Sequence, residues 1–123
     1  MIAFIAVGGA VGSVIRWWLM TLFPVPVGEI PWITVAINVA GSFILGFLAR
    51  IFMTHSQSPA LVAALTVGFC GGFTTFSAFS ADTLRLIQGG NWGRAALYVM
   101  VSVLLALGGI ALGEWSAHAV RAG

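Results

Sequence analysis

The side chains best suited to handle an ion lie in one short stretch, residues 71–80, which reads Gly-Gly-Phe-Thr-Thr-Phe-Ser-Ala-Phe-Ser. Glycine lowers helix stability and threonine hydroxyls compete for backbone carbonyls, so this stretch predicts a helix interrupted at residues 71–75. In a membrane, irregular backbone is tolerated only where protein buries it or where it lines a water-filled cavity. The interruption therefore predicts a functional site at residues 71–75.

Phenyl rings and hydroxyls share one face of the helix expected beyond this break. At about 100° per residue, a helix beginning near Thr75 places on one stripe Phe76, Phe79, Ser80 and Thr83. Each residue alone is most simply explained as packing, or as a hydroxyl bonded to its own helix. Together they favour an ion pathway, because the positive edge of an aromatic ring stabilises an anion without a formal charge.

Further polar residues stand in apolar surroundings elsewhere in the chain. Asn38 carries an amide that either bonds a neighbouring helix or faces a pore. Arg16 lies well along the first apolar run, where it either snorkels to the headgroups or has a structural or vestibule role. Tyr98 and Ser102 are four residues apart and share a helix face.

The elements that must position these residues are transmembrane helices. The chain of 123 residues is 60% hydrophobic and 7% charged, so a soluble domain of this size would lack a polar surface. At about 20 residues per crossing, the length predicts an all-α membrane protein with four transmembrane helices in a single domain, residues 1–123. The expected spans are residues 2–23, 32–52, 60–87 and 92–115. The third exceeds one straight crossing, which fits two half-helices around the break.

The positive charges hardly distinguish the two sides of the membrane. If the N-terminus and the second loop share a side, two arginines lie there and three lie opposite. They are Arg50 and Arg121 on one side, and Arg16, Arg85 and Arg94 on the other. This weak bias predicts insertion in both directions and an antiparallel, dual-topology homodimer. Glycine pairs at 8/12 and 109/113 predict close helix packing, and burying them also favours a partner chain.

The chemistry available within the spans indicates passive transport. They contain no carboxylate pair, nucleophile–base combination or metal-ligand cluster, so we expect no enzyme. Proton coupling is disfavoured because Asp82 lies near the end of the third span. Five arginines are too sparse for a nucleic-acid surface, and the expected surroundings are the lipid bilayer. These residues predict a passive pathway for a small ion, with anions favoured over cations.

Three motifs in order resemble those of a known family. Gly12-Ser-Val-Ile-Arg16-Trp17, Ala36-Ile-Asn38-Val-Ala-Gly41 and the string over residues 71–80 are similar to those of the small bacterial fluoride channels, the Fluc or CrcB family. The resemblance covers nearly the whole chain. It implies a multi-pass protein of the inner (plasma) membrane and an antiparallel homodimer with two pores. Each pore would conduct fluoride, so that accumulated cytoplasmic fluoride leaks out.

The resemblance also implies which side chains form the pore. These are Asn38, Thr75, Phe76, Phe79, Ser80, Tyr98 and Ser102. Phe76 and Phe79 match the paired phenylalanines whose rings approach fluoride. Tyr98 and Ser102 match the start of a polar track on the fourth helix.

A structural sodium ion on the dimer axis is implied as well. Backbone carbonyls of Gly71 and Thr74 from both subunits would hold it, and Arg16 is assigned a vestibule or structural role. Two positions depart from the family pattern. Ala106 stands where the track often has serine, and Asp82 stands where glutamate is usual, so neither is assigned a function.

Two other functions are compatible with a small membrane protein of four helices. A dual-topology drug or ion transporter is one, but such exporters rely on a glutamate in the first span, which here contains no acid. A non-conducting assembly subunit would explain the glycine pairs but not the stripe of phenyl rings and hydroxyls.

Overall fold

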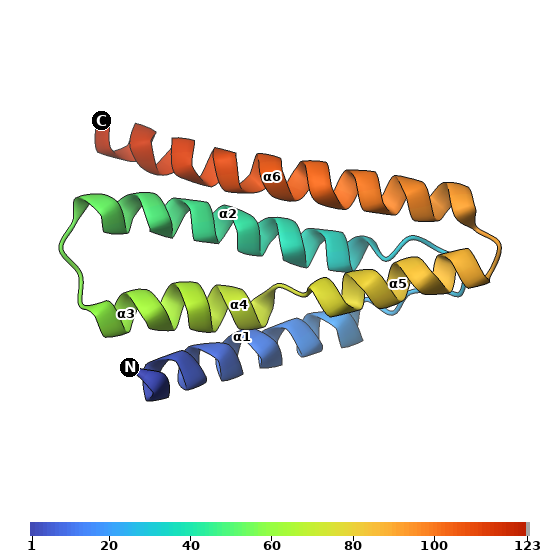
Figure 1. The fold of residues 1–123 in the computed structure, drawn as a ribbon, viewed down its shortest axis with the longest axis horizontal. Helices are drawn as coiled ribbons and strands as arrows, with labels where there is room; N and C mark the ends of the chain where they lie inside the picture. Colours follow the sequence, from blue (N-terminus) through green and yellow to red (C-terminus); the bar gives the residue numbers. More distant parts are fainter. Residues whose placement is uncertain (123) are drawn as a thin grey trace.

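The computed structural model describes residues 1–122, which form a bundle of long helices with no β-strand in that range (Figure 1). Four segments are long and apolar enough to cross a membrane. They are Ile2–Leu22, Trp32–Thr54, Pro59–Gln88 and Trp92–Arg121. The predicted all-α architecture with four spans is therefore confirmed.

The third crossing is composite, whereas the other three are single helices. The elements in chain order are α1 (Ile2–Leu22), α2 (Trp32–Thr54), α3 (Pro59–Ala63), η1 (Ala64–Cys70), α4 (Gly71–Phe73), α5 (Phe76–Gln88) and α6 (Trp92–Ala122). η1 is a π-helical segment. At the start of the crossing, the Ser58 hydroxyl accepts a hydrogen bond from the Leu61 amide at 3.2 Å. Pro59 follows in the first turn, so this end has a standard N-cap.

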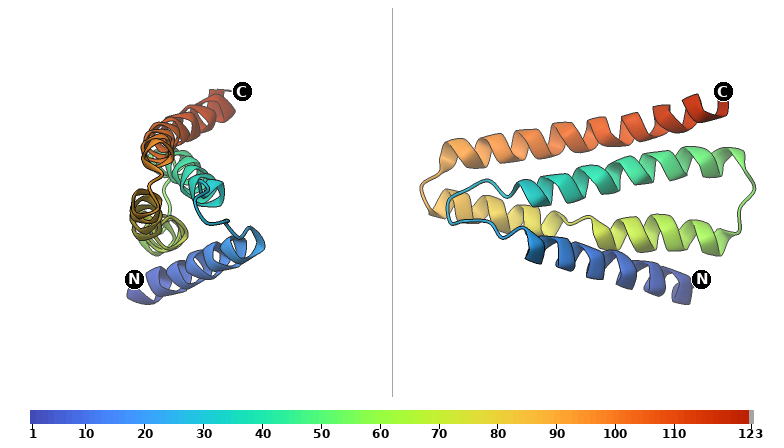
Figure 2. Two further views of the ribbon diagram at one scale, coloured as in Figure 1. Left: turned by 90° about the vertical axis from the view of Figure 1, so that its right-hand side faces the viewer. Right: turned by 180° about the vertical axis from the view of Figure 1, so that it is seen from behind.

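The helices lie roughly side by side along the long axis of the molecule. α2 lies between α6 and the third crossing, and α1 packs against η1 and α4 (Figure 1). Beyond the end of α1, the irregular residues 23–31 run alongside α5, as the reverse view shows (Figure 2). α1 and α2 therefore flank the break in the third crossing.

The glycine pairs pack within the chain rather than against a partner. A Cβ on Gly12 would overlap the Phe69 carbonyl, and one on Gly113 would overlap the Phe43 carbonyl. The predicted close packing is thus confirmed, because only glycine lets these backbones approach. These glycine pairs therefore do not favour a partner chain as expected, since helices of the same chain already pack against them.

The break is shorter than predicted and lies slightly later. Thr74 and Thr75 have extended backbone, with ψ of 156° and 113°. Gly71 and Gly72 remain helical in α4. A Cβ on Gly72 would lie 3.0 Å from the Gly9 Cα atom, so Gly72 serves close approach to α1 rather than a left-handed turn.

α6 continues two turns past the predicted end at residue 115. The apolar run stops there, but no proline or glycine follows before residue 122, so nothing ends the helix. The extra turns carry His118 and Arg121, which suit the polar edge of a bilayer.

Candidate ion pathway

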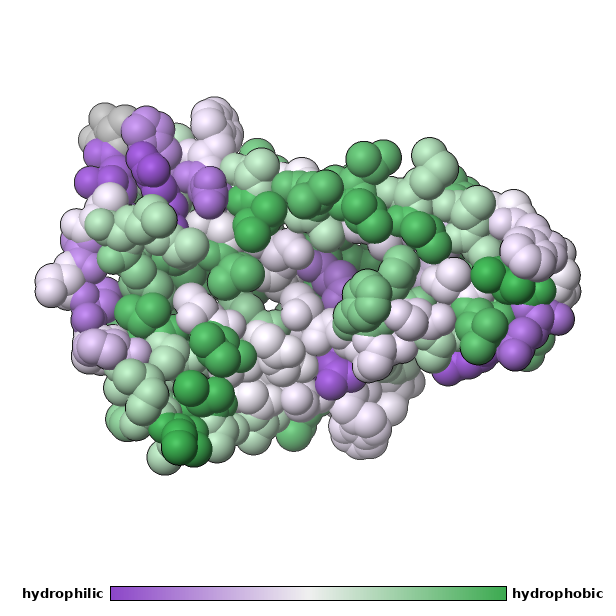
Figure 3. Space-filling view, in the orientation of Figure 1, coloured by the Kyte–Doolittle hydropathy of each residue, from purple (hydrophilic) through white to green (hydrophobic). Residues whose placement is uncertain are grey.

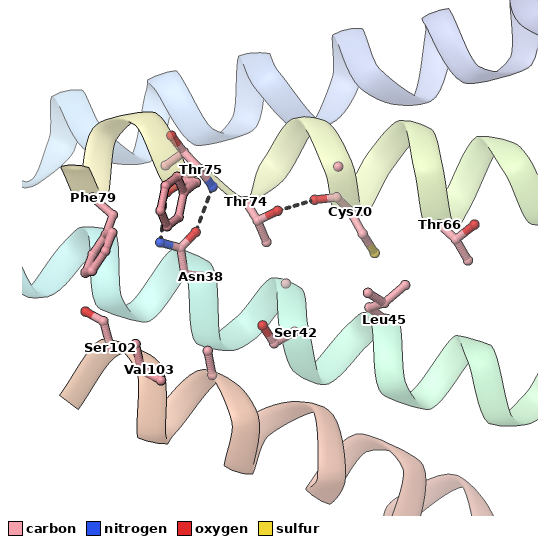
Figure 4. Close-up of a pocket in the computed structure, with 14 residues that line it drawn as sticks. Asn38, Ser42, Leu45, Thr66, Cys70, Thr74, Thr75, Phe79, Ser102 and Val103 are labelled. Carbon is pink, nitrogen blue, oxygen red and sulfur yellow. Dashed lines mark hydrogen bonds between the residues drawn. The ribbon is translucent and has the colours of Figure 1, made fainter. Parts of the chain in front are cut away.

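A cavity of about 370 Å³ opens beside the break, between α2, the third crossing and α6 (Figure 4). We call it the first cavity. Seven of the residues predicted to bind ions line it: Asn38, Gly71, Thr74, Thr75, Phe76, Phe79 and Ser102. Among the described residues, its lining includes no charged side chain. Three predicted residues, Arg16, Ser80 and Tyr98, lie outside it.

Asn38 holds the break from α2. Its Nδ2 donates to the Thr75 carbonyl at 3.1 Å, and the Thr75 amide donates to its Oδ1 at 2.7 Å. The side-chain amide thus replaces the helical partners that extended backbone loses. Asn38 thus bonds the third crossing and also lines the first cavity, while its role in a pore stays a prediction. The second N–H of the amide has no hydrogen-bond partner among the described residues.

Thr75 begins α5 with its side chain. Its hydroxyl accepts a hydrogen bond from the Ala78 amide at 3.0 Å, which is an N-cap. The cap fixes the direction of the first turn, from which Phe76 and Phe79 project. Thr75 is buried, and its hydroxyl also lies 3.2 Å from the Ser77 hydroxyl.

Three aromatic rings form a row along α5 and α6. The centroids of Phe76 and Phe79 are 5.6 Å apart, and those of Phe79 and Tyr98 are 5.3 Å apart. Both pairs are tilted by about 40°, between a stacked and an edge-to-face arrangement. Phe76 is 80% exposed in the single chain, whereas Tyr98 is fully buried.

Ser102 supplies an unbonded hydroxyl to the first cavity from α6. The residue is 7% exposed, and its Oγ has no hydrogen-bond partner within residues 1–122. A buried hydroxyl without a partner is unfavourable unless a ligand or water satisfies it. Ala106, one turn later, also lines the cavity and offers no polar atom.

Ser80, predicted to line the pore, bonds its own helix and does not line the first cavity. Its hydroxyl donates to the Phe76 carbonyl at 2.9 Å, one turn back along the same helix, and the side chain lies outside the first cavity. A serine inside a helix commonly satisfies itself in this way. The simpler explanation considered for the hydroxyls of the stripe thus holds for Ser80.

Tyr98 bonds an acid to which sequence reasoning gave no function. Its hydroxyl donates to Asp82 Oδ2 at 3.1 Å, and the Thr34 hydroxyl donates to the same oxygen at 3.1 Å. Arg85 Nη1 donates to Asp82 Oδ1, also at 3.1 Å. The Asp82 side chain is 12% exposed, so a nearly buried carboxylate is held by three donors. Only the spacing to Arg85 was visible in the sequence, since the other two donors come from separate helices.

Arg16 hydrogen-bonds the backbone next to the break. Its Nε donates to the Gly72 carbonyl at 3.1 Å, and the Ser13 hydroxyl donates to the same oxygen at 3.4 Å. The carbonyl is one of those that the end of α4 leaves without a helical partner. This contact favours the structural role considered for Arg16, which stays a prediction.

Two carbonyls at the break accept no hydrogen bond within the described part of the chain, those of Gly71 and Thr74. The Thr75 amide, which would reach Gly71 in a continuous helix, bonds Asn38 instead. The Thr74 side chain turns back, and its hydroxyl donates to the Cys70 carbonyl at 2.8 Å. Free carbonyls of this kind are suitable ligands for a hard cation.

With this geometry described, comparison with known proteins gives the family. The family model described as CrcB-like protein, Camphor Resistance (CrcB), matches residues 3–114. The chain belongs to the CrcB family. Membership agrees with the resemblance of the three motifs, and the matched residues extend into all four spans of this multi-pass membrane protein.

Curated relatives of this CrcB-family chain are named "Fluoride-specific ion channel FluC". The protein of Gluconobacter oxydans (strain 621H) is 39% identical over 124 residues, covering 97% of this chain and 85% of the relative. That of Novosphingobium aromaticivorans is 45% identical over 114 residues, covering 90% of each chain. That of Opitutus terrae is 45% identical over 120 residues, covering 93% of this chain and 89% of the relative.

Proposed function

We propose that this chain forms a fluoride-selective ion channel of the plasma membrane, which lets cytoplasmic fluoride leave passively and so relieves its toxicity. The observation that carries the proposal is the first cavity, whose described lining is uncharged yet includes an amide, an unbonded hydroxyl and tilted rings. The names of the relatives support fluoride as the ion. The activity is that of a channel and not of an enzyme.

Fluoride would exchange water for weak dipoles along this path. Asn38 offers its remaining N–H, Ser102 offers its O–H, and Phe76 and Phe79 offer ring edges. Each ring contributes about 0.5–1.5 kcal/mol by analogy with aromatic pairs, so several contacts together are needed to offset dehydration. Because no formal charge among the described residues lines the first cavity, the ion is not trapped there and can leave.

We infer that the working unit is an antiparallel, dual-topology homodimer with two pores. Phe76 is 80% exposed in the single chain although it belongs to the pathway, so this wall is incomplete without a second chain. The face that carries the break has a polar patch in the middle of apolar side chains (Figure 3). The near-even split of arginines between the two sides supports insertion in both directions.

The two unpaired carbonyls at the break fit the sodium ion that the family implies. Gly71 and Thr74 would hold it with their backbone oxygens, four in all from two chains. When bound, such an ion supplies a fixed positive charge where the two breaks meet. The Thr74→Ala variant keeps the carbonyl and is therefore expected to retain the ion.

The test of function is fluoride efflux from liposomes that contain the purified protein. A fluoride electrode follows efflux while valinomycin carries potassium as the counter-ion, and chloride-loaded vesicles test selectivity. We expect rapid release of fluoride and little release of chloride. Vesicles that release fluoride no faster than empty ones would overturn the proposal. Reporter fusions beyond residue 122 test topology, and signal from one side of the membrane alone would overturn the antiparallel dimer.

A further inference from the structure

A second cavity, of about 410 Å³, lies under the connection between α1 and α2. Residues 23–31 form its outer wall, and we call them the cover. Thr34, Ala78, Asp82 and Arg85 line its inner side, and Met20 lines it at the end of α1. Unlike the first cavity, the second has charged groups in its lining.

A short chain of side-chain contacts connects the linings of the two cavities. Phe79 lines the first cavity and packs on Tyr98, with ring centroids 5.3 Å apart. The Tyr98 hydroxyl in turn bonds Asp82, which lines the second cavity. A single side chain, the fully buried Tyr98, thus bridges a residue of one cavity to a residue of the other.

The cover is held at its α2 end by Ile30, which packs against the buried cluster around Tyr98, whereas its middle has few hydrogen bonds to other helices. Pro24, Pro26 and Pro31 have no backbone N–H and cannot donate hydrogen bonds. Within residues 1–122, the only side chain that hydrogen-bonds the cover is Arg94 at the start of α6. Its Nη1 donates to the Gly28 carbonyl at 2.6 Å and lies 3.2 Å from Glu29 Oε1.

The contact falls where the cover turns most sharply. Gly28 has φ of +82°, a conformation that side chains other than glycine rarely adopt. The Glu29 amide closes a turn there by donating to the Pro26 carbonyl at 3.1 Å. Arg94 therefore holds the cover at its sharpest turn. Its bond to the Gly28 carbonyl is a bond to the backbone, so it does not require the Glu29 side chain.

We propose that the second cavity is the water-filled mouth of the anion pathway and that Arg94 is a positioning residue that holds its cover. The inference rests on the proposed function and adds to it a route beyond Tyr98. The cover keeps lipid out of the cavity, so its position sets the width of the mouth. Loosening the cover changes access to the cavity without altering the first cavity.

A thiol placed at Met20 reports on water in the second cavity. The Met20→Cys variant in liposomes is exposed on both sides to a membrane-impermeant sulfonate thiol reagent, and modification is followed by mass. Val14→Cys, on the same helix with Val14 61% exposed and outside both cavities, is the matched control. The parent protein, whose Cys70 is buried, gives the background. We expect Met20→Cys to react at least tenfold faster than Val14→Cys, and its fluoride efflux to fall on modification.

The role of Arg94 is tested in the Met20→Cys background. Arg94→Gln removes the charge and the guanidinium fork, and Gly28→Ala strains the tip of the cover independently. Both are expected to change the modification rate several-fold. Arg121→Gln removes the same charge at the far end of α6, where Arg121 is exposed, and is expected to leave the rate unchanged. Glu29→Gln, which keeps the bond to the Gly28 carbonyl, is expected to have a smaller effect than Arg94→Gln.

The rate of thiol modification is measured in the absence of fluoride, so the outcomes distinguish failure of this inference from failure of the proposed function. Equal rates for Met20→Cys and Val14→Cys in a protein that conducts fluoride would overturn the water-filled mouth alone. Equal rates for Arg94→Gln and Arg121→Gln would overturn the role of Arg94. A parent protein that releases no fluoride would overturn the proposed function, and with it the assignment of the cavity to an anion pathway.

Discussion

Asn38 and Thr75, which are 37 positions apart in the chain, exchange two hydrogen bonds through a side-chain amide and a backbone peptide. The Asn38 side chain bonds Thr75 as the backbone of a neighbouring β-strand would: its N–H donates to the Thr75 carbonyl and its oxygen accepts from the Thr75 amide. This pair fixes where the third crossing opens. The carbonyl-rich break and the first turn of α5 both depend on it.

Replacing Asn38 by alanine is expected to destabilise the protein by about 2–4 kcal/mol, because two backbone groups then lose their partners in a water-poor environment. Thermal unfolding in detergent measures the change, and fluoride efflux should fall with it. Ser42→Ala is the control, since Ser42 lines the same cavity one turn along α2. If the two variants unfold at the same temperature, the pairing contributes nothing to the break.

Replacing Phe79 or Phe76 by isoleucine is expected to slow fluoride efflux while leaving stability little changed. Isoleucine keeps apolar bulk but removes the ring edge, and a loss of about 1.4 kcal/mol at the barrier corresponds to roughly tenfold in rate. Methionine should be tolerated better, because its sulfur is polarizable. Phe47→Ile, in a stacked pair outside the first cavity, is the control. Full efflux in both isoleucine variants would make the rings packing residues.

Asp82 and Tyr98 are expected to be coupled energetically. Asp82→Ala leaves two buried hydroxyls without their acceptor, and Tyr98→Phe removes one of these donors. The double variant should therefore be less destabilised than the sum of the single variants, by about 1 kcal/mol. Chemical denaturation of all four proteins measures the coupling. Strictly additive effects would mean that the 3.1 Å hydrogen bond between Tyr98 and Asp82 contributes nothing to stability.

Arg16→Met is expected to lower stability by about 1.5–3 kcal/mol, since it removes a charged donor from the Gly72 carbonyl while keeping the apolar stem. Arg121→Met, at an exposed position, is the control for loss of charge. The melting temperatures of the two variants should differ by several degrees. A snorkelling arginine would instead give equal and small effects.

The sequence predicted most of the fold because long apolar runs report directly on membrane spans. It predicted a break over residues 71–75, and the structure confines that break to Thr74 and Thr75 while Gly71 and Gly72 stay helical. Composition alone could not reveal that Gly72 allows close packing against α1, or that the Asn38 side chain would bond the Thr75 backbone at the break. Those facts depend on which helices become neighbours.

The same limit applies to the candidate site. Seven predicted residues line the first cavity because they cluster near the break or face it from α2 and α6. Ser80 fell outside because its hydroxyl finds a carbonyl on its own helix. Asp82 was left without a role because Thr34 and Tyr98, its partners, lie 48 and 16 positions away. Spacing in the sequence relates residues of one helix, and it does not predict which residues of three different helices will meet.

The π-helical segment Ala64–Cys70 has a consequence for how relatives should align. A π-helical turn contains about one residue more than an α-helical turn, so it is the trace that a single inserted residue leaves in a continuous helix. Deleting one residue there would restore an ordinary helix and rotate everything before it by about 100°. Family members of different length are therefore expected to show one-residue gaps within 64–70, and none between Gly71 and Phe79, where a shift of one position would carry the rings away from the cavity.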